Sequence, residues 1–242
     1  ITGITYDTIL KIIDFDKKYV VIGKPCDIEA LINYTKLDWE LKKCIKYTMT
    51  FFCAGAPSKN ATLKLAENLG VQVDQIDSVR YRGNGWPGKA TITLKDKSKR
   101  HMEYIDSWNR ILGRNIRKMC KFCVNGVGMY ADISCGDLWN LDQNQKPEFT
   151  EGKGQNIIFA RSKAGRDLLI EASNKGYLYL ENYTKMNDLK YIQPNHYNMQ
   201  TTMSGKIVGM KIVGCNLIPQ YNIKKLFEAS KEISKVKLMR TA

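Results

Sequence analysis

The chain has 242 residues, of which 43% are hydrophobic and 26% charged, the ordinary balance of a globular protein. Its formal net charge of +14 favours anionic partners such as nucleotides, phosphorylated cofactors, acidic proteins or nucleic acid. The seven cysteines lack the spacing of a small secreted domain, and no apolar run approaches the ~20 residues that span a bilayer, which argues against a disulfide scaffold and a membrane span. From this cysteine usage we expect a reducing, cytoplasmic location, and the start at Ile1 does not resemble a signal peptide.

Two successive strand–loop–helix units open the chain. In each, a short apolar run is followed by a loop with Gly and Pro and then by a helical pattern. Ser58 is expected to cap the second helix, and Gly70 to end it. The repetition predicts a parallel sheet covered by helices. The strand, loop and helix ranges are 19–22, 23–27 and 28–34 in the first unit, and 47–52, 53–58 and 59–69 in the second.

The rest of the chain alternates between strand and helix patterns. Residues 91–94 and 101–105 predict a hairpin, residues 108–118 an arginine-rich helix, and residues 156–160 a strand followed by a helix over 164–175. The tail over 223–238 predicts an amphipathic helix with a solvated basic face. The fold class is therefore α/β: a mixed, largely helix-covered β-sheet with an inserted hairpin and a cysteine-bearing loop region. We expect a core over residues 1–176 and a helical or mixed extension over 177–242.

Four cysteines are candidate metal ligands. Cys120-Lys-Phe-Cys123 brings two thiolates close enough to hold one metal centre. Cys26 and Cys53 fall at predicted helix starts, where unpaired N–H groups and the helix dipole stabilise anionic sulfur. Four thiolates suit an iron–sulfur cluster or a structural zinc ion, and spacing does not choose between them. The alternative without metal makes Cys26 and Cys53 small buried hydrophobic residues.

Two segments are candidate anion sites, because they combine cations with glycines that allow close approach of the main chain to a phosphate. In the first, Trp86 could pack against a planar ring, and the second lies where helix N-termini bind phosphate. A structural turn is the alternative for both, and no dinucleotide-binding glycine fingerprint is present. The candidate residues are Arg80, Arg82, Gly83, Gly85, Trp86 and Gly88 in the first segment, and Arg161, Ser162, Lys163 and Gly165 in the second.

No catalytic residue is assigned, because neither histidine sits in a hydrolytic pattern. Asp132 and Asp137 flank Cys135, which is expected to be a buried thiol. A carboxylate at either position could hydrogen-bond a flavin, but a turn or a helix cap is the preferred interpretation.

The motifs, taken in order, resemble the beta subunit of coenzyme F420 hydrogenase/dehydrogenase. The matching pieces extend over about residues 19–173, most of the chain. Each piece is weak alone, and the ordered set is specific. The pieces are Gly23–Leu31, Cys53–Ser58, Val79–Gly88, Cys120–Cys123, Ala131–Trp139 and Arg161–Gly165.

This resemblance implies FAD beside a 4Fe-4S cluster whose ligands are Cys26, Cys53, Cys120 and Cys123. It also implies that the loop over 80–88 and the turn over 161–165 line the flavin site. The activity would be that of an oxidoreductase passing electrons between a two-electron carrier, an anionic deazaflavin such as coenzyme F420 or similar, and one-electron partners. The partner would be a redox protein or subunit of the ferredoxin, hydrogenase or dehydrogenase type. Relative to the family, we expect almost all of an upstream segment to be missing, and part of the flavin pocket with it.

The alternative is a non-catalytic binding or structural subunit. Zinc or a cluster would stabilise its fold, and a basic face would bind an acidic protein or nucleic acid. Nucleic acid is disfavoured because the aromatic residues are not interleaved with basic ones on a clear strand face.

Overall fold

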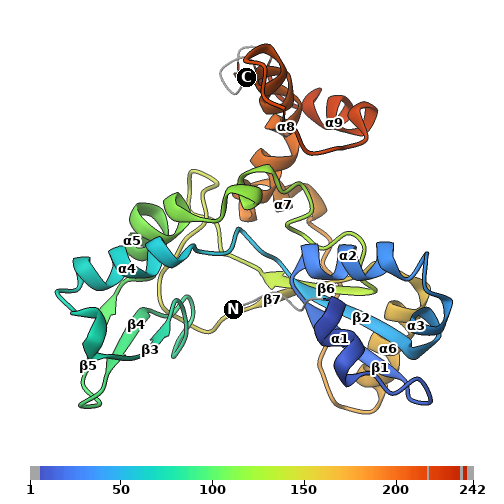
Figure 1. The fold of residues 1–242 in the computed structure, drawn as a ribbon, viewed down its shortest axis with the longest axis horizontal. Coiled ribbons are helices and arrows are strands. Elements are labelled where there is room, and N and C mark those ends of the chain that lie inside the picture. The colour runs from blue at the N-terminus through green and yellow to red at the C-terminus, as the bar shows by residue number, and fades with distance from the viewer. Residues whose placement is uncertain (1–5, 217, 235–236, 239–242) are drawn as a thin grey trace. The chain divides into compact units, whose positions relative to one another are not determined.

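A computed structural model describes residues 6–216, 218–234 and 237–238 (Figure 1). The chain start at Ile1 and part of the expected tail helix lie outside these residues. The fold is mixed α/β, as predicted. Chain contacts divide it into two compact units, each described here by itself. The first unit comprises Ile1–Cys53, Asn125–Leu138 and Gln155–Asn187, and the second comprises Ala54–Val124, Trp139–Gly154 and Asp188–Ala242. The predicted boundary between residues 176 and 177 does not coincide with this division and stays a prediction.

The first unit is built on a four-stranded mixed sheet in the order β1-β2-β6-β7. β1, β2 and β6 are parallel, and β7 runs antiparallel to β6. Helix α2 begins directly after β1 and packs on β1 and β2, as expected for a strand–loop–helix unit. The strands are β1 (Tyr19–Gly23), β2 (Ile45–Phe51), β6 (Ile133–Asp137) and β7 (Asn156–Ala160), and the helices are α1 (Tyr6–Ile12), α2 (Pro25–Tyr34), α3 (Trp39–Cys44) and α6 (Lys163–Asn174).

Asp132 joins three elements of the first unit. One carboxylate oxygen accepts hydrogen bonds from the main-chain N and from Oγ1 of Thr48, both at 2.8 Å. The other oxygen accepts a bond from Oγ of Ser162 at 2.5 Å. The Ser162 hydroxyl in turn caps α6 by accepting from the N–H of Gly165. Asp132 therefore ties β2 and the start of β6 to the first turn of α6.

The second unit contains a three-stranded antiparallel sheet in the order β3-β4-β5. The predicted hairpin is confirmed as β4 and β5, and Ser58 caps α4 as expected, accepting from the N–H of Ala61 at 3.3 Å. Helices α4 and η2 cover the sheet with a shared apolar core that includes Leu65, Ile92 and Leu112. The elements are α4 (Lys59–Asn68), η1 (Val73–Gln75), β3 (Ile76–Arg80), β4 (Ala90–Leu94), β5 (Lys99–Met102), α5 (Tyr104–Asp106) and η2 (Ser107–Leu112).

The predicted continuous helix over 108–118 is wrong. The segment forms the π-helical turn η2, then a short 3-10 turn η3 (Gly113–Asn115), an extended Ile116, and a second 3-10 turn η4 (Lys118–Phe122). Ile116 is extended because it pairs with Pro57, and the flanking main chain bonds the same loop. A tertiary contact therefore overrides the local helix preference.

The C-terminal part of the second unit is helical. Helices α8 and α9 pack through Met203, Ile207 and Leu226, which are all buried. The predicted tail helix is confirmed over residues 223–230. Within the described ranges, none of the helices combines the length and the apolar character that crossing a membrane requires. The elements are η5 (Met186–Asp188), which bridges the division between the units, α7 (Leu189–Ile192), α8 (Pro194–Ile212) and α9 (Ile223–Ser230).

His196 on α8 makes the stability of the protein sensitive to pH. Burial lowers the pKa of this imidazole from 6.5 to about 4. The unfolded chain therefore binds more protons than the folded one between these values, so the free energy of unfolding is expected to fall by about 3 kcal/mol as the pH drops from 6.5 to 4. Urea titrations across this range should show that His196→Gln removes this component. The matched variant at the exposed His101, His101→Gln, should keep it, and equal pH slopes for both variants would contradict the assignment.

Candidate functional site

Cys26 and Cys53 lie at the carboxyl edge of the sheet in the first unit. Gly23 at the end of β1 pairs with Thr50 near the end of β2, so the chain leaves both strands at the same edge. Cys26 is exposed and is the second residue of α2, as predicted. Cys53 was also expected at a helix start, and this is wrong because α4 begins only at Lys59. Cys53 instead occupies the loop after β2, where its N–H donates to the carbonyl of Gly126 at 2.8 Å.

Cys120 and Cys123 lie in and directly after the 3-10 turn η4 of the second unit. The N–H of Cys120 donates to the carbonyl of Arg117, and the N–H of Cys123 donates to the carbonyl of Cys120. The Sγ atom of Cys120 accepts a hydrogen bond from the N–H of Ala56 at 3.4 Å. Such a bond stabilises negative charge on sulfur, which a metal-bound thiolate needs.

The loop over 54–58 is paired with the segment that leads into the cysteine pair. Arg117 donates its N–H to the carbonyl of Ala56, and Ser58 donates its N–H to the carbonyl of Asn115, both at 2.9 Å. Pro57 and Ile116 form an antiparallel bridge between them. A Cβ atom on Gly55 would lie only 2.9 Å from a side-chain carbon of Ile116, so the close approach requires glycine there.

The four cysteines supply the thiol donors that an iron–sulfur cluster or a zinc ion requires, and they fall into two pairs. Each unit supplies one pair of candidate thiol ligands, and each pair is fixed by main-chain bonds of its own unit. Among the residues that the structure describes, no three Cys, His, Asp or Glu side chains form a group that could hold a metal ion. The joining of the two pairs around one centre therefore stays a prediction.

Cys135 differs from the four candidates in its surroundings. It lies within β6, and burial raises the pKa of its thiol. A raised pKa favours the neutral thiol, which is a poor metal ligand. Cys135 accordingly stays outside the ligand set.

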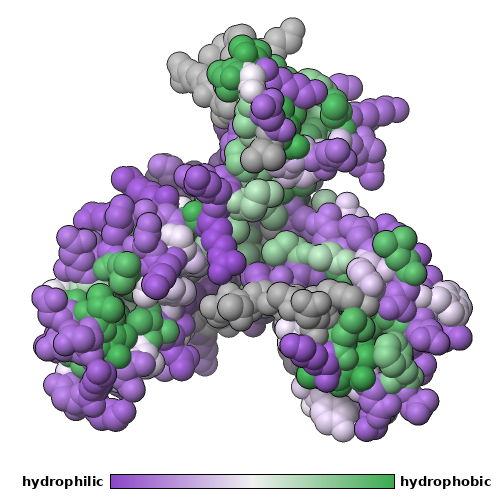
Figure 2. Space-filling model, in the orientation of Figure 1, coloured by the Kyte–Doolittle hydropathy of each residue, from purple (hydrophilic) through white to green (hydrophobic). Residues whose placement is uncertain are grey.

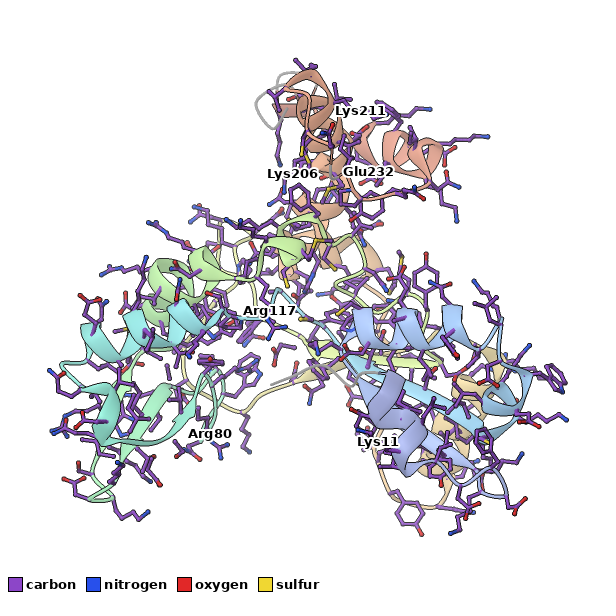
Figure 3. The ribbon with its side chains drawn as sticks, viewed as in Figure 1. Lys11, Arg80, Arg117, Lys206, Lys211 and Glu232 are labelled. Carbon is purple, nitrogen blue, oxygen red and sulfur yellow. The ribbon has the colours of Figure 1, made fainter. Side chains whose placement is uncertain are left out.

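The predicted flavin loop over 80–88 is held by Glu151. One carboxylate oxygen of Glu151 accepts from the N–H of Trp86 at 2.7 Å, and the other accepts from the N–H of Gly88 at 3.3 Å. The ring of Trp86 stacks on Trp139 with centroids 4.6 Å apart. The guanidinium of Arg82 lies over Trp139 and donates to the carbonyl of Pro87 at 2.6 Å. Arg80 lies at the end of β3, where the loop begins (Figure 3).

The backbone conformation and close contacts of this loop explain why glycine occupies two of its positions. Gly85 has φ 146°, and a Cβ atom there would overlap a carboxylate oxygen of Glu151. Gly88 has φ 73°, and a Cβ atom there would lie 2.6 Å from the carbonyl oxygen of Gly83. The structural-turn alternative thus accounts for the glycines. Flavin binding by Arg80, Arg82, Gly83, Gly85, Trp86 and Gly88 stays a prediction.

Replacing Glu151 with alanine is expected to loosen this loop. The N–H groups of Trp86 and Gly88 would lose a charged acceptor, at a cost of about 1 kcal/mol in the free energy of unfolding. Near-ultraviolet circular dichroism should show a weaker signal from the stacked Trp86–Trp139 pair. Glu148→Ala, in the same segment, removes only a bond from the hydroxyl of Thr150 and should leave the spectrum unchanged. An unchanged spectrum for Glu151→Ala would refute the role of this carboxylate.

The second predicted flavin segment, over 161–165, belongs to the first unit and has mainly structural contacts. The guanidinium of Arg161 lies 4.4 Å from the ring centroid of Phe159 and donates to the carbonyl of Val127 at 3.2 Å. Ser162 caps α6, and a Cβ atom on Gly165 would overlap the carbonyl of Asp132. Lys163 is exposed as the first residue of α6. The structure therefore places the two predicted flavin segments in different units.

Sequence reasoning singled out Asp132 with a turn or a helix cap as the preferred interpretation, and its bond to the capping residue Ser162 agrees with a structural role. Two other residues that organise these segments, Trp139 and Glu151, were missed. Trp139 belongs to a recognised motif, but only its ring contacts show what it does. Nothing in the sequence indicated a role for Glu151, because an isolated carboxylate in a polar segment is ordinarily solvated.

Together, the mixed sheet and the two cysteine pairs define an α/β protein with a candidate thiolate centre. The family model for the C terminus of the beta subunit of coenzyme F420 hydrogenase/dehydrogenase matches residues 16–186, and the chain belongs to this family.

Its curated relatives include the F420-dependent formate dehydrogenase subunit beta of Methanocaldococcus jannaschii, 28% identical over 166 residues, which are 69% of this chain and 39% of that protein. The F420-dependent formate dehydrogenase 1 subunit beta of Methanococcus maripaludis is 24% identical over 163 residues, 67% of this chain and 39% of that protein. The chain thus spans about two fifths of the length of these relatives.

A solved structure of the F420-reducing [NiFe] hydrogenase complex from Methanosarcina barkeri contains a chain of similar fold. The TM-score is 0.52 with 16% sequence identity, over 85% of this chain and 66% of that chain. At this identity the likeness supports the fold alone.

Proposed function

We propose that this chain forms the cluster- and flavin-binding part of an oxidoreductase. It would pass electrons between a two-electron carrier, coenzyme F420 or a similar deazaflavin, and one-electron partners. When bound, a flavin supplies two-electron hydride chemistry and a 4Fe-4S cluster supplies one-electron transfer. The observation that carries the proposal is the thiol of Cys120, held by the loop that follows Cys53 in a chain of this family.

The covalent chain favours a common centre for both cysteine pairs. Ala56, whose N–H binds the sulfur of Cys120, lies three positions after Cys53, and Gly126, whose carbonyl accepts from Cys53, lies three positions after Cys123. Each stretch reaches at most about 11 Å between Cα atoms. This limit follows from bond lengths and holds for any arrangement of the two units. It supports Cys53, Cys120 and Cys123 as ligands of one centre, with Cys26 as the remaining proposed ligand.

The part of the chain after Cys123 also favours this ligand set. The side chain of Asn125, which is buried, donates to a carboxylate oxygen of Glu29 at 2.9 Å. Glu29 lies on α2, the helix that begins at Pro25 and carries Cys26. The loop that follows Cys123 is thus hydrogen-bonded to the helix that carries Cys26, the remaining proposed ligand.

For FAD, we propose that Arg80 and Lys163 supply positive charge for its phosphates. Arg82 is engaged within its own loop, and the glycines are explained by turn geometry. The partner would be an acidic redox protein or subunit of the ferredoxin, hydrogenase or dehydrogenase type, since the net charge is +14 and hydrophilic residues cover much of the visible surface (Figure 2). The cytoplasmic location stays a prediction from cysteine usage.

Metal and flavin analysis of anaerobically prepared protein tests this proposal. We expect a broad visible absorbance, with ~4 iron and ~4 acid-labile sulfide per chain and bound FAD. A colourless protein holding zinc would instead support the alternative, a non-catalytic binding or structural subunit stabilised by zinc. Iron without flavin would retain the cluster and remove the flavin from the proposal.

A further inference from the structure

The cysteine-bearing turn of the second unit is held from one side by the C-terminal part of the chain. Three carbonyls of the segment accept hydrogen bonds from side chains of that part. Lys206 Nζ donates to the carbonyl of Lys121 at 3.3 Å, and Gln200 Nε2 donates to the carbonyl of Val124 at 3.2 Å. The hydroxyl of Tyr221 donates to the carbonyl of Phe122. All three donors lie beyond residues 16–186, the range that the family model covers.

Apolar packing supports the same contact. Phe122 and Val124 pack against the cluster formed by Met203, Ile207 and Leu226. Met203 is 0% exposed, and Phe122 and Val124 are partly buried against the cluster. The turn itself has few internal bonds, because η4 is only five residues long. Its conformation therefore depends on neighbours: Ala56 holds the sulfur of Cys120, and side chains of α8 and of the loop before α9 hold the carbonyls of Lys121, Phe122 and Val124.

Lys206 stands out among these donors because it carries charge. Its side chain is partly buried on α8, and burial lowers the pKa of its ammonium group. Its only other polar contact is Sδ of Met199 at 3.4 Å, and no carboxylate of the described residues pairs with it. A partly buried ammonium without a counter-charge is costly. An anionic centre beside Lys121, one of the two residues between Cys120 and Cys123, would supply that counter-charge.

We propose that Lys206 is a positioning residue of the Cys120–Cys123 turn, and that its charge raises the reduction potential of the centre the turn holds. The positioning role follows from the hydrogen bond to Lys121, and the electrostatic role from the lack of a carboxylate partner among the described residues. Reduction adds negative charge to a cluster, so a nearby cation favours the reduced form. The electrostatic role rests on the proposed function, whereas the positioning role does not.

Three variants on α8 separate these roles: Lys206→Met, Lys206→Arg and Lys211→Met. Lys211 is an exposed lysine on the same helix and serves as the matched control (Figure 3). Hydrogen exchange of residues 118–124, measured on the full chain, reports positioning with or without a cluster. We expect about tenfold faster exchange for Lys206→Met, as for the loss of one charged hydrogen bond, and little change for the other two variants. Redox titration of the cluster by electron paramagnetic resonance should show a lower midpoint potential for Lys206→Met alone.

The outcomes distinguish failure of this inference from failure of the proposed function. If the wild-type protein holds no cluster, the proposed function and the electrostatic role fail, and hydrogen exchange still decides the positioning role. If it holds a cluster and Lys206→Met matches Lys211→Met in both exchange and potential, the inference is overturned. Unchanged far-ultraviolet circular dichroism establishes that each variant is folded. Should Lys206→Met unfold, Lys206→Gln takes its place, since it removes the charge and keeps a donor, and an unchanged potential would overturn the electrostatic role.

Discussion

Replacing either Cys120 or Cys123 with alanine is expected to abolish the visible absorbance and the iron content of the anaerobically prepared protein. Each substitution removes a proposed thiolate ligand, and a four-thiolate cluster does not form stably when one of its sulfur ligands is missing. The fold should survive, because neither residue belongs to an apolar core cluster among the described residues. Optical spectra and iron analysis on the same samples give the result.

Cys215→Ala is the matched control for this experiment. Cys215 follows α8 in the second unit, outside the proposed ligand set, and the variant should retain the wild-type spectrum and iron content. Full iron content in Cys120→Ala would remove Cys120 from the ligand set. Loss of iron in Cys215→Ala as well would show that the loss reflects instability rather than ligation.

Asp132→Ala is expected to destabilise the first unit by about 4 kcal/mol, the largest effect on stability that we predict. The substitution leaves the main-chain N–H of Thr48 and the hydroxyls of Thr48 and Ser162 without their charged acceptor. Hydrogen bonds to a charged group contribute about 1.5–3 kcal/mol each, and the loss of several bonds from one side chain is not fully additive. Urea denaturation followed by far-ultraviolet circular dichroism measures the change.

Two comparisons sharpen this test. Asp132→Asn keeps one carbonyl oxygen and should lose roughly half as much stability, since its amide nitrogen cannot accept a hydrogen bond. Asp167→Ala removes an exposed carboxylate on α6 whose ion pair with Arg166 is at the surface, and it should cost less than about 0.5 kcal/mol. A loss below about 1 kcal/mol for Asp132→Ala would show that this carboxylate is not a junction of the fold.

Local patterns predicted the regular elements well where the sequence signal and the tertiary contacts agree. The hairpin of β4 and β5, the cap at Ser58 and the helix α2 after β1 were all expected from periodicity and capping residues. Residues 108–118 were mispredicted because pairing of Ile116 with Pro57 interrupts a run with helical composition. Strand β3 was not predicted, since three of its five residues are polar and its place depends on β4.

For the candidate site, the residue types were likewise predictable from the sequence and the tertiary contacts were not. Its thiols and their grouping as pairs were readable from residue types, because only a few side chains suit a thiolate centre. The contacts that hold them were not readable: the N–H of Ala56 on Cys120, and Lys206 on the carbonyl of Lys121, join residues that lie 64 and 85 positions apart. Such contacts are set by how helices and loops pack, and no local pattern encodes them.

The sequence by itself determined the class of fold, the four candidate sulfur ligands and the family, because these depend on residue chemistry, short-range periodicity and the order of motifs. Tertiary structure alone decided that Asp132 and Glu151 act as junctions, that the glycines of the 80–88 loop serve its turns, and that the C-terminal helices hold the cysteine-bearing turn. The physical reason is distance along the chain. Hydrogen bonds and packing between remote segments form only once the whole chain has folded around them.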